Sequence, residues 1–247
     1  EYETYTEVET LNSMVPIWRK NKNELTDEDY NSFYKEKFFD YSDPLKVIHT
    51  YTEGAATYHA LLFIPAKAPY NYYTRDYEKG LKLYASGVLI MDSCKDLLPD
   101  HFSFVKGLVD SEDLSLNISR ETLQENIVLR KISQTISKQI LSHLEKMAKD
   151  DAEKYNSFWK LHGKVFKLGY SDFVNRDRIT PLLRFNSSAM EDADGLTSLD
   201  DYISRARESQ KEIWYVAAPL SNEDMNEFDK LLETIRKVLG DQIKDAR

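Results

Sequence analysis

The chain has 247 residues, of which 41% are hydrophobic and 30% are charged, and its formal net charge is −9. This composition is typical of a globular protein and excludes a wholly disordered chain, and the length suits two moderate domains. The negative charge argues against general nucleic-acid binding, which needs clustered Lys and Arg. The longest apolar runs, at 60–64 and 87–91, are far shorter than the roughly 20 residues that span a bilayer, so no membrane-spanning segment is expected.

The ends of the sequence and its single cysteine indicate a compartment. The first residues have no basic segment followed by an apolar one, so we expect no signal peptide. Cys94 is the only cysteine, which excludes an internal disulfide and a cysteine-rich zinc site. Both observations favour the reducing cytoplasm as the location of the protein.

The common catalytic motifs are missing from the sequence. No dinucleotide-binding glycine motif, Walker A loop, zinc-protease motif or nucleophile elbow is present. Gly163-Lys164 resembles the end of a phosphate-binding loop, but Phe158 stands where the first glycine belongs and Val165 replaces the Ser or Thr. The five histidines show no ligand spacing, so we predict no metal site: they are His49, His59, His101, His143 and His162. We therefore expect that the chain does not catalyse a reaction alone.

The first predicted helix begins near residue 26. Thr26 can act as its N-cap, with Asp29 three residues later. Aromatic residues then recur at helical spacing, at Tyr30, Phe33, Tyr34 and Phe38. We interpret this stripe as the face that packs against a sheet.

Residues 45–92 have the pattern of β-strands. Alternation predicts strands over 47–51, 58–64 and 81–91, and Pro65 ends the second because proline cannot donate to a strand ladder. The segment 66–79 is predicted to be a loop. We expect these three strands to belong to one sheet.

Residues 109–124 are predicted to form a polar, acidic loop that leads into a long helix. The helix would run from Arg120 to about residue 149, with Ser119 as its N-cap and apolar residues mostly four apart on one face. Shorter helices are expected over 152–196, followed by a short helix over 199–207 and a buried strand over 213–217. An acidic amphipathic helix is expected from Ser221 onwards.

The start of the predicted long helix is the candidate site. It brings together Asn117, Ser119, Arg120 and Gln124. Helix N-termini favour anions, and the guanidinium of Arg120 is suited to phosphate. Alternatively, Arg120 pairs with Glu112 or Asp113 in a purely structural role, which the residues alone favour.

The segment from Val109 to Gln124 (VDSEDLSLNISRETLQ) resembles the signature of the middle domain of the Hsp90 chaperone family. Other stretches agree in order and spacing, among them 16–18 (PIW), 60–69 (ALLFIPAKAP), 89–94 (LIMDSC) and 104–107 (FVKG). The similarity covers about residues 10–218 and is strongest to the bacterial form of the family. Ser115 departs from the pattern, because many members carry proline there.

This resemblance implies a split ATPase. In this family, ATP and Mg²⁺ are bound mainly by an N-terminal domain, which this chain lacks, and the middle domain supplies an arginine to the γ-phosphate. The matching residue is Arg120, with Gln124 beside it as a second catalytic residue, and Asn117 and Ser119 shaping the nucleotide-sensing loop. No cofactor is expected to bind to this chain by itself.

The resemblance also implies the fold and its divisions. We expect an α/β (α+β) fold of the Hsp90 middle-domain type, with a mixed sheet like that of ribosomal S5 domain 2. Residues 1–149 would form a large α/β subdomain, 150–194 a helical connector and 195–219 the start of a small α/β layer. Residues 220–247 resemble the opening of the C-terminal dimerisation domain, so a family segment after Pro219 is expected to be missing.

The implied partners are those of a chaperone. They are the protein's own N-terminal ATPase domain and C-terminal dimerisation domain, unfolded or partly folded client proteins, and a second copy in a homodimer; no nucleic acid or membrane is expected. The candidate client-binding residues are Trp18, Tyr70, Tyr72 and Tyr73, although each is equally well explained as a core or loop anchor. The residues leave two other functions open: a stand-alone interaction scaffold without a nucleotide role, and an RNA-binding α/β module, which the negative charge disfavours.

Overall fold

The computed structural model describes residues 15–68, 72, 77–115, 126–187, 189–190, 195–210 and 212–215. The chain divides into two compact units, Glu1–Leu168 and Gly169–Arg247. Among the described residues, no helix combines the length and the hydropathy that a membrane span requires.

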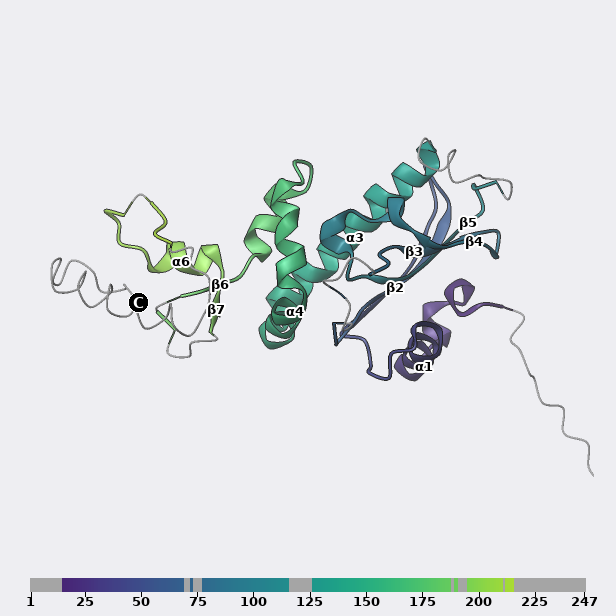
Figure 1. The fold of residues 1–247 in the computed structure, drawn as a ribbon, viewed down its shortest axis with the longest axis horizontal. Helices are drawn as coiled ribbons and strands as arrows, with labels where there is room; N and C mark the ends of the chain where they lie inside the picture. The colour runs from purple at the N-terminus through teal and green to yellow at the C-terminus, as the bar shows by residue number, and fades with distance from the viewer. Residues whose placement is uncertain are drawn as a thin grey trace, which may run out of the picture. The chain divides into compact units, whose positions relative to one another are not determined.

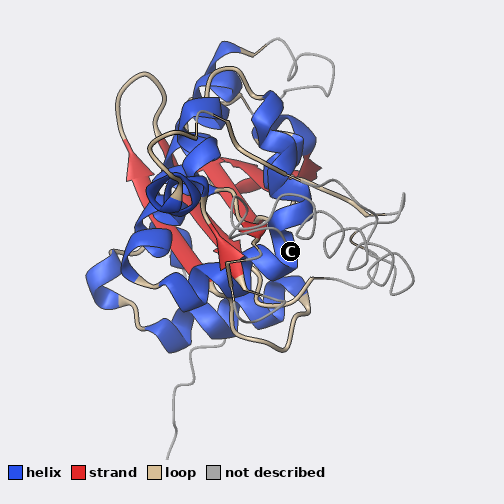
Figure 2. Ribbon diagram, turned by 90° about the vertical axis from the view of Figure 1, so that its left-hand side faces the viewer, coloured by secondary structure: helices blue, strands red, loops and turns tan. Residues whose placement is uncertain are grey.

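The first unit is built on a five-stranded mixed sheet (Figure 1; Figure 2, strands in red). Its strands are β1 (Lys46–Thr52), β2 (Tyr58–Ile64), β3 (Leu81–Ala85), β4 (Val88–Cys94) and β5 (Lys106–Ser111). They lie in the order β1-β2-β5-β3-β4, and every neighbouring pair is antiparallel except β3 and β5. The predicted mixed α/β fold is confirmed, as is the placement of the predicted strands in one sheet.

The prediction of one strand over residues 81–91 is wrong. The chain reverses at Ser86 and Gly87, whose φ angles are 49° and 83°, and β3 and β4 form a hairpin. Two successive residues with positive φ make the kind of tight turn that matches the twist of antiparallel strands. Glycine adopts this conformation without a steric cost, whereas Ser86 is forced into it.

The prediction of a loop beginning at Val109 is also wrong, because 106–111 form β5, the central strand of the sheet. Its sequence contains residues that are poor strand formers, among them Gly107, Asp110 and Ser111. Gly107 has φ 144°, and a Cβ atom there would collide with the carbonyl oxygen of Leu61 on β2. The close approach of two backbones, rather than strand propensity, explains this glycine.

Helix α1 (Asp27–Phe38) covers one face of the sheet (Figure 1). As predicted, Thr26 caps it in a reciprocal capping box with Asp29. Its aromatic stripe packs on Phe63 of β2, with Tyr34 at a ring-centroid distance of 5.0 Å and Phe38 at 5.9 Å. The core on this face comprises Trp18, Tyr30, Tyr34, Leu61, Phe63, Tyr84 and Leu108.

Helices α3 (Ile127–Asp150) and α4 (Ala152–Phe166) complete the first unit, and α3 lies on the opposite side of the sheet from α1 (Figure 1). The predicted apolar face of α3 is confirmed from Ile132 onwards, through Ile136 and Ile140. Its predicted start is wrong, since the helix begins at Ile127 with Asn126 as N-cap rather than at Arg120 with Ser119. The side chain of Asn126 accepts hydrogen bonds from two backbone N–H groups of the first turn and so caps the helix.

The second unit contains short elements. They are η5 (Lys167–Ser171, which begins at the end of the first unit), α5 (Arg176–Ile179), η6 (Thr180–Leu182), β6 (Phe185–Asn186), β7 (Leu196–Thr197) and α6 (Leu199–Arg205). A capping box between Ser198 and Asp201 starts α6, near the predicted position. The predicted buried strand over 213–217 is wrong where the structure describes it. Trp214 and Tyr215 are 76% and 84% exposed, in irregular backbone.

Candidate functional site

The predicted site residues Asn117, Ser119, Arg120 and Gln124 lie outside the described residues. The structure does describe both ends of the segment that carries them, up to Ser115 on one side and from Asn126 on the other. We call residues 116–125 the sensing segment, after the role predicted for it from the sequence, and the residues on either side of it are as follows.

The end of β5 is fastened to the neighbouring turn before the sensing segment begins. Ser111 Oγ donates to the carbonyl oxygen of Thr57 over 2.7 Å, and the Thr57 N–H donates to Asp113 Oδ2 over 2.6 Å. The Asp113 N–H also donates to Ser111 Oγ over 3.3 Å. Leu114 is 4% exposed, so the chain stays anchored in the core to within two residues of the segment.

A buried carboxylate, Asp110, lies one residue before this anchor. Its Oδ2 accepts from Trp18 Nε1 (2.9 Å) and Arg19 Nε (2.8 Å), and its Oδ1 accepts from the Gly87 N–H (2.9 Å). Burial by itself would raise the pKa of Asp110, but the hydrogen bonds from Arg19, Trp18 and Gly87 outweigh it and hold the pKa below its usual value. Asp110 is therefore an ionised, fully buried acceptor in the centre of the sheet.

The short helix η1 (Ile17–Arg19) is held from a second side by a histidine. His49 Nε2 lies 3.0 Å from the carbonyl oxygen of Trp18, and its Nδ1 lies 2.8 Å from the Tyr30 hydroxyl. A carbonyl can only accept, so Nε2 carries the proton in the neutral ring. Burial lowers the pKa of His49 and favours that neutral form.

The far end of the sensing segment is a capped helix start. Asn126 Oδ1 accepts from the N–H groups of Val128 (2.8 Å) and Leu129 (3.2 Å). Ile127, the first residue of α3, is 67% exposed, whereas Leu129 is buried. The sensing segment thus connects two ordered ends, an anchored central strand and a long helix with its own cap.

The two carboxylates next to the segment already have partners in the described structure. Glu112 lies 3.7 Å from a guanidinium nitrogen of Arg19, and Asp113 accepts from Thr57. The structural alternative for Arg120 assigned it to one of these two carboxylates.

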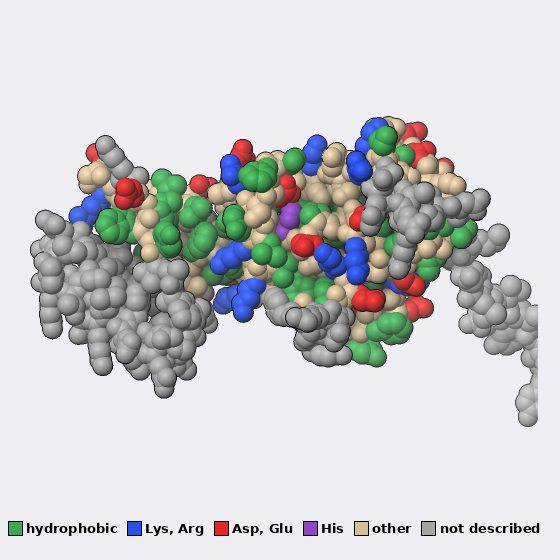
Figure 3. Space-filling model, turned by 45° about the horizontal axis from the view of Figure 1, so that its top comes forward, with side chains coloured by type: hydrophobic (Ala, Val, Ile, Leu, Met, Phe, Trp, Pro, Cys, Tyr) green, Lys and Arg blue, Asp and Glu red, His purple; other side chains and the backbone are tan. Residues whose placement is uncertain are grey.

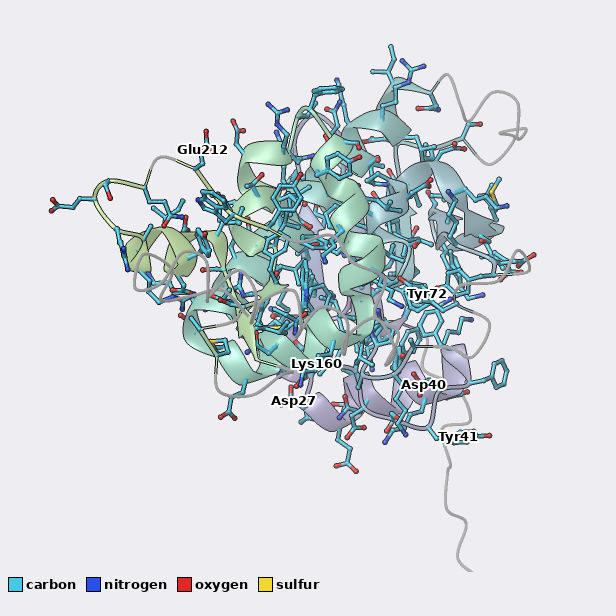
Figure 4. The ribbon with its side chains drawn as sticks, turned by 60° about the vertical axis from the view of Figure 1, so that its left-hand side comes forward. Asp27, Asp40, Tyr41, Tyr72, Lys160 and Glu212 are labelled. Atoms are coloured by element: carbon cyan, nitrogen blue, oxygen red, sulfur yellow. The ribbon has the colours of Figure 1, made fainter. Side chains whose placement is uncertain are left out.

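The predicted client-binding aromatics divide into two described and two undescribed residues. Trp18 is 8% exposed and Tyr72 is 5% exposed, whereas the prediction rested on exposed rings. Trp18 packs on Tyr84 at a ring-centroid distance of 5.1 Å, and Tyr72 on Tyr77 at 4.8 Å (Figure 4 labels Tyr72). Tyr70 and Tyr73 lie outside the described residues.

Other large apolar side chains are exposed instead, which the sequence did not indicate. They are at least three-quarters exposed at Phe39, Tyr41, Phe173, Val174, Trp214 and Tyr215. Figure 4 shows Tyr41 pointing away from the body of the protein. No periodicity distinguished these residues from core aromatics, because they lie in turns and irregular backbone rather than on one face of an element.

The described surface carries charges of both signs (Figure 3). Basic and acidic side chains are interspersed on the described surface seen in Figure 3. Among the described residues, no three His, Cys, Asp or Glu side chains gather in a way that could hold a metal ion. Cys94 is a buried free thiol whose pKa is raised by burial.

The chain is similar to known proteins in both sequence and fold. Residues 1–239 match the family model described as "Hsp90 protein". The chaperone protein HtpG of Bacillus subtilis is 52% identical over 95% of this chain, and that of Clostridium acetobutylicum is 54% identical over the same share. In each case the chain spans 37% of the relative's own length. Among solved structures, the middle domain of a Plasmodium falciparum heat shock protein aligns with a TM-score of 0.72 and 29% identity, covering 87% of each chain.

Proposed function

The chain belongs to the Hsp90 family, and we propose that it is the middle region of an ATP-dependent molecular chaperone whose nucleotide pocket lies in an N-terminal domain outside this chain. In this proposal the sensing segment completes the ATPase site when the two domains dock. The observation that carries the proposal is the likeness to an Hsp90 middle domain over 87% of the chain, together with the signature residues at 109–124.

Arg120 has the central role in the proposed chemistry. Negative charge on the γ-phosphoryl oxygens is stabilised in the transition state by a planar guanidinium with several N–H donors. Gln124 adds a neutral donor, and Asn117 and Ser119 set the conformation of the segment. Mg²⁺, held with ATP mainly by the N-terminal domain, neutralises phosphate charge when bound.

The contacts at the two ends of the sensing segment support these roles. An arginine delivered from another domain contributes to catalysis only if its position is fixed to within a fraction of an ångström. The sensing segment begins at a strand end held by Ser111, Asp113 and the buried Asp110, and it ends at the cap Asn126. Its base is therefore preorganised before any nucleotide arrives.

The cellular role follows the family. We propose that the full-length protein is a cytoplasmic homodimer that binds unfolded or partly folded client proteins and acts in the stress response. Docking of the N-terminal domain on this region would gate hydrolysis, while the C-terminal domain would hold the dimer together. Exposed apolar side chains outside the regular elements, such as Phe39 and Phe173, are better candidates for client contact than the buried Trp18 and Tyr72.

The test is the substitution Arg120→Ala in the full-length protein. Because the arginine meets the γ-phosphate only in the docked state, turnover should fall strongly while nucleotide affinity stays nearly unchanged. Arginine fingers are worth about 10³ to 10⁵ in rate. We expect the lower end of that range or less, since slow domain closure can already limit turnover.

Three further variants separate the proposal from a structural role. Arg120→Lys should restore only part of the activity, because an ammonium cannot form a two-pronged contact. Gln124→Ala should be milder than Arg120→Ala, and Lys131→Ala removes an exposed charge from α3 as a matched control. If Arg120→Ala hydrolyses ATP at the wild-type rate or unfolds the domain, the phosphate-sensing role is wrong. The first result, with client binding intact, would favour a scaffold without a nucleotide role.

A further inference from the structure

The buried carboxylate of Asp110 joins three segments that are distant in sequence. Trp18 and Arg19 come from η1, Gly87 from the turn between β3 and β4, and Asp110 itself from the central strand β5. Asp110 is 0% exposed, and the side chain of Arg19 is 27% exposed. One side chain therefore fixes the relative positions of η1, the hairpin turn and the strand that leads to the sensing segment.

The same region has a second set of contacts that run to the end of β5. The Ser86 N–H donates to the carbonyl oxygen of Ser111 over 3.1 Å, next to the Gly87 N–H that binds Asp110. Arg19 extends beyond Asp110 to within 3.7 Å of Glu112. The turn and Arg19 thus contact the end of β5 and the residue that follows it, a few residues before the sensing segment begins.

The choice of a carboxylate is chemically specific. Three donors converge on Asp110, two on Oδ2 and one on Oδ1, and only an ionised carboxylate accepts on both atoms. An asparagine would direct its NH₂ group either at the Gly87 N–H or at the Trp18 and Arg19 donors. Arg19 Nη2 is already buried without a hydrogen-bond partner among the described residues, so the guanidinium depends on Asp110.

The buried ion pair between Arg19 and Asp110 need not add to the stability of the fold. Replacing a buried ion pair by apolar residues of similar volume is often neutral or stabilising, whereas a buried pair can fix one unique arrangement. Trp18, which donates to Asp110, belongs with Tyr84 and Leu108 to the apolar core on this face of the sheet.

We propose that Asp110 is a positioning residue for the ATPase reaction: through Arg19 and the turn at Gly87 it fixes the end of β5, from which the chain continues to Arg120. This inference rests on the proposed function. It adds a residue that touches neither nucleotide nor protein partner, and it predicts that the loss of its charge slows turnover without weakening nucleotide binding.

The experiment is Asp110→Asn in the full-length protein, assayed well below its unfolding midpoint. The readouts are kcat at saturating ATP, normalised to nucleotide-binding sites titrated with ADP, together with KM and the ADP Kd. A misplacement of about 1 Å can cost about 10²-fold in rate. We expect kcat to fall by about tenfold or more, with KM and Kd within roughly twofold of wild type.

The matched control is Asp92→Asn, which makes the same change on an exposed carboxylate that pairs with Lys82 on the neighbouring strand. It should leave kcat within roughly twofold of wild type. Arg19→Met keeps most of the packing of Arg19 and removes one of the three donors, so its kcat should fall less than that of Asp110→Asn. The double variant with Asp110→Asn and Arg19→Met should be no slower than Asp110→Asn alone, because both changes disrupt the same contact between Arg19 and Asp110.

The outcomes separate the two proposals. If Asp110→Asn turns over at the wild-type rate per binding site while Arg120→Ala is slow, Asp110 is only structural and the proposed function stands. If Arg120→Ala is also fast, the proposed function itself fails. Should Asp110→Asn not fold, Arg19→Met decides: a wild-type kcat overturns the positioning role, and a lower kcat with unchanged Kd supports it.

Discussion

His162 on α4 and Pro65 at the end of β2 are joined by a hydrogen bond of 3.0 Å, which sets the protonation of the imidazole. The carbonyl of Pro65 can only accept, so Nε2 carries the proton. Nδ1 is buried without a hydrogen-bond partner among the described residues, and the ring stacks on Phe104 at a centroid distance of 4.9 Å. Burial lowers the pKa of His162 to about 4, and the ring is therefore neutral in the folded protein.

We predict that His162 makes the first unit less stable in acid. Its pKa is about 4 when folded and near 6.5 when unfolded, so between these values only the unfolded chain binds the proton. The stabilisation is complete above about pH 6.5 and is lost as the pH falls towards 4, by roughly 3 kcal/mol. Denaturant unfolding at pH 7 and pH 4.5 measures this loss.

The variant His162→Gln provides the control for that measurement. Its amide can donate to Pro65 but does not titrate, so it should lose less stability between the two pH values than the wild type. Burial also lowers the pKa of His49, His59 and His143, and these contributions have the same sign in both proteins. An equal loss in the two proteins would show that His162 does not control the acid response.

The cap of α3 gives a second prediction. Asn126→Ala removes the acceptor for the N–H groups of Val128 and Leu129 and should cost about 1 kcal/mol in the free energy of unfolding. Asn126→Asp keeps an acceptor and places a negative charge at the positive end of the helix, so it should remain close to wild type. If Ala and Asp are equally destabilising, the cap interaction is not the source of the effect.

Two glycines with positive φ should respond very differently to alanine. At Gly87 a Cβ atom meets nothing within 4 Å, so Gly87→Ala should cost only the backbone strain, about 1 kcal/mol. At Gly107 the Cβ atom would collide with the backbone of Leu61 in the neighbouring strand, and the cost should be about 3 kcal/mol or more. Denaturant midpoints compare the two variants, and equal midpoints would contradict the close packing of β5 on β2.

The sequence predicted the elements whose local signals agree with their surroundings. Thr26 and Asp29 begin α1 as expected, and the strand over 58–64 ends before Pro65, because capping and proline chemistry act over a few residues. The apolar face of α3 was predictable because it repeats over several turns, from Ile132 to Met147.

The failures occur where tertiary contacts outweigh local propensity. β5 carries Gly107, Asp110 and Ser111, each unfavourable in a strand, and it is stable because β2 and β3 pair with it on both sides. The importance of Asp110 was hidden for the same reason, since its partners Trp18 and Gly87 are 92 and 23 residues away in sequence. The predicted client role of Trp18 required an exposed ring, and the sequence did not show that tertiary contacts bury it.

The central claim is that the ATPase site is split, with the arginine in this chain and the nucleotide pocket outside it. The most direct test is the rate of ATP hydrolysis by the purified 247-residue chain alone. We predict no turnover above background, because the carboxylate that orients the attacking water would lie in the N-terminal domain. Turnover by the pure chain that is abolished by Arg120→Ala would contradict the split site and show that this chain holds a complete one.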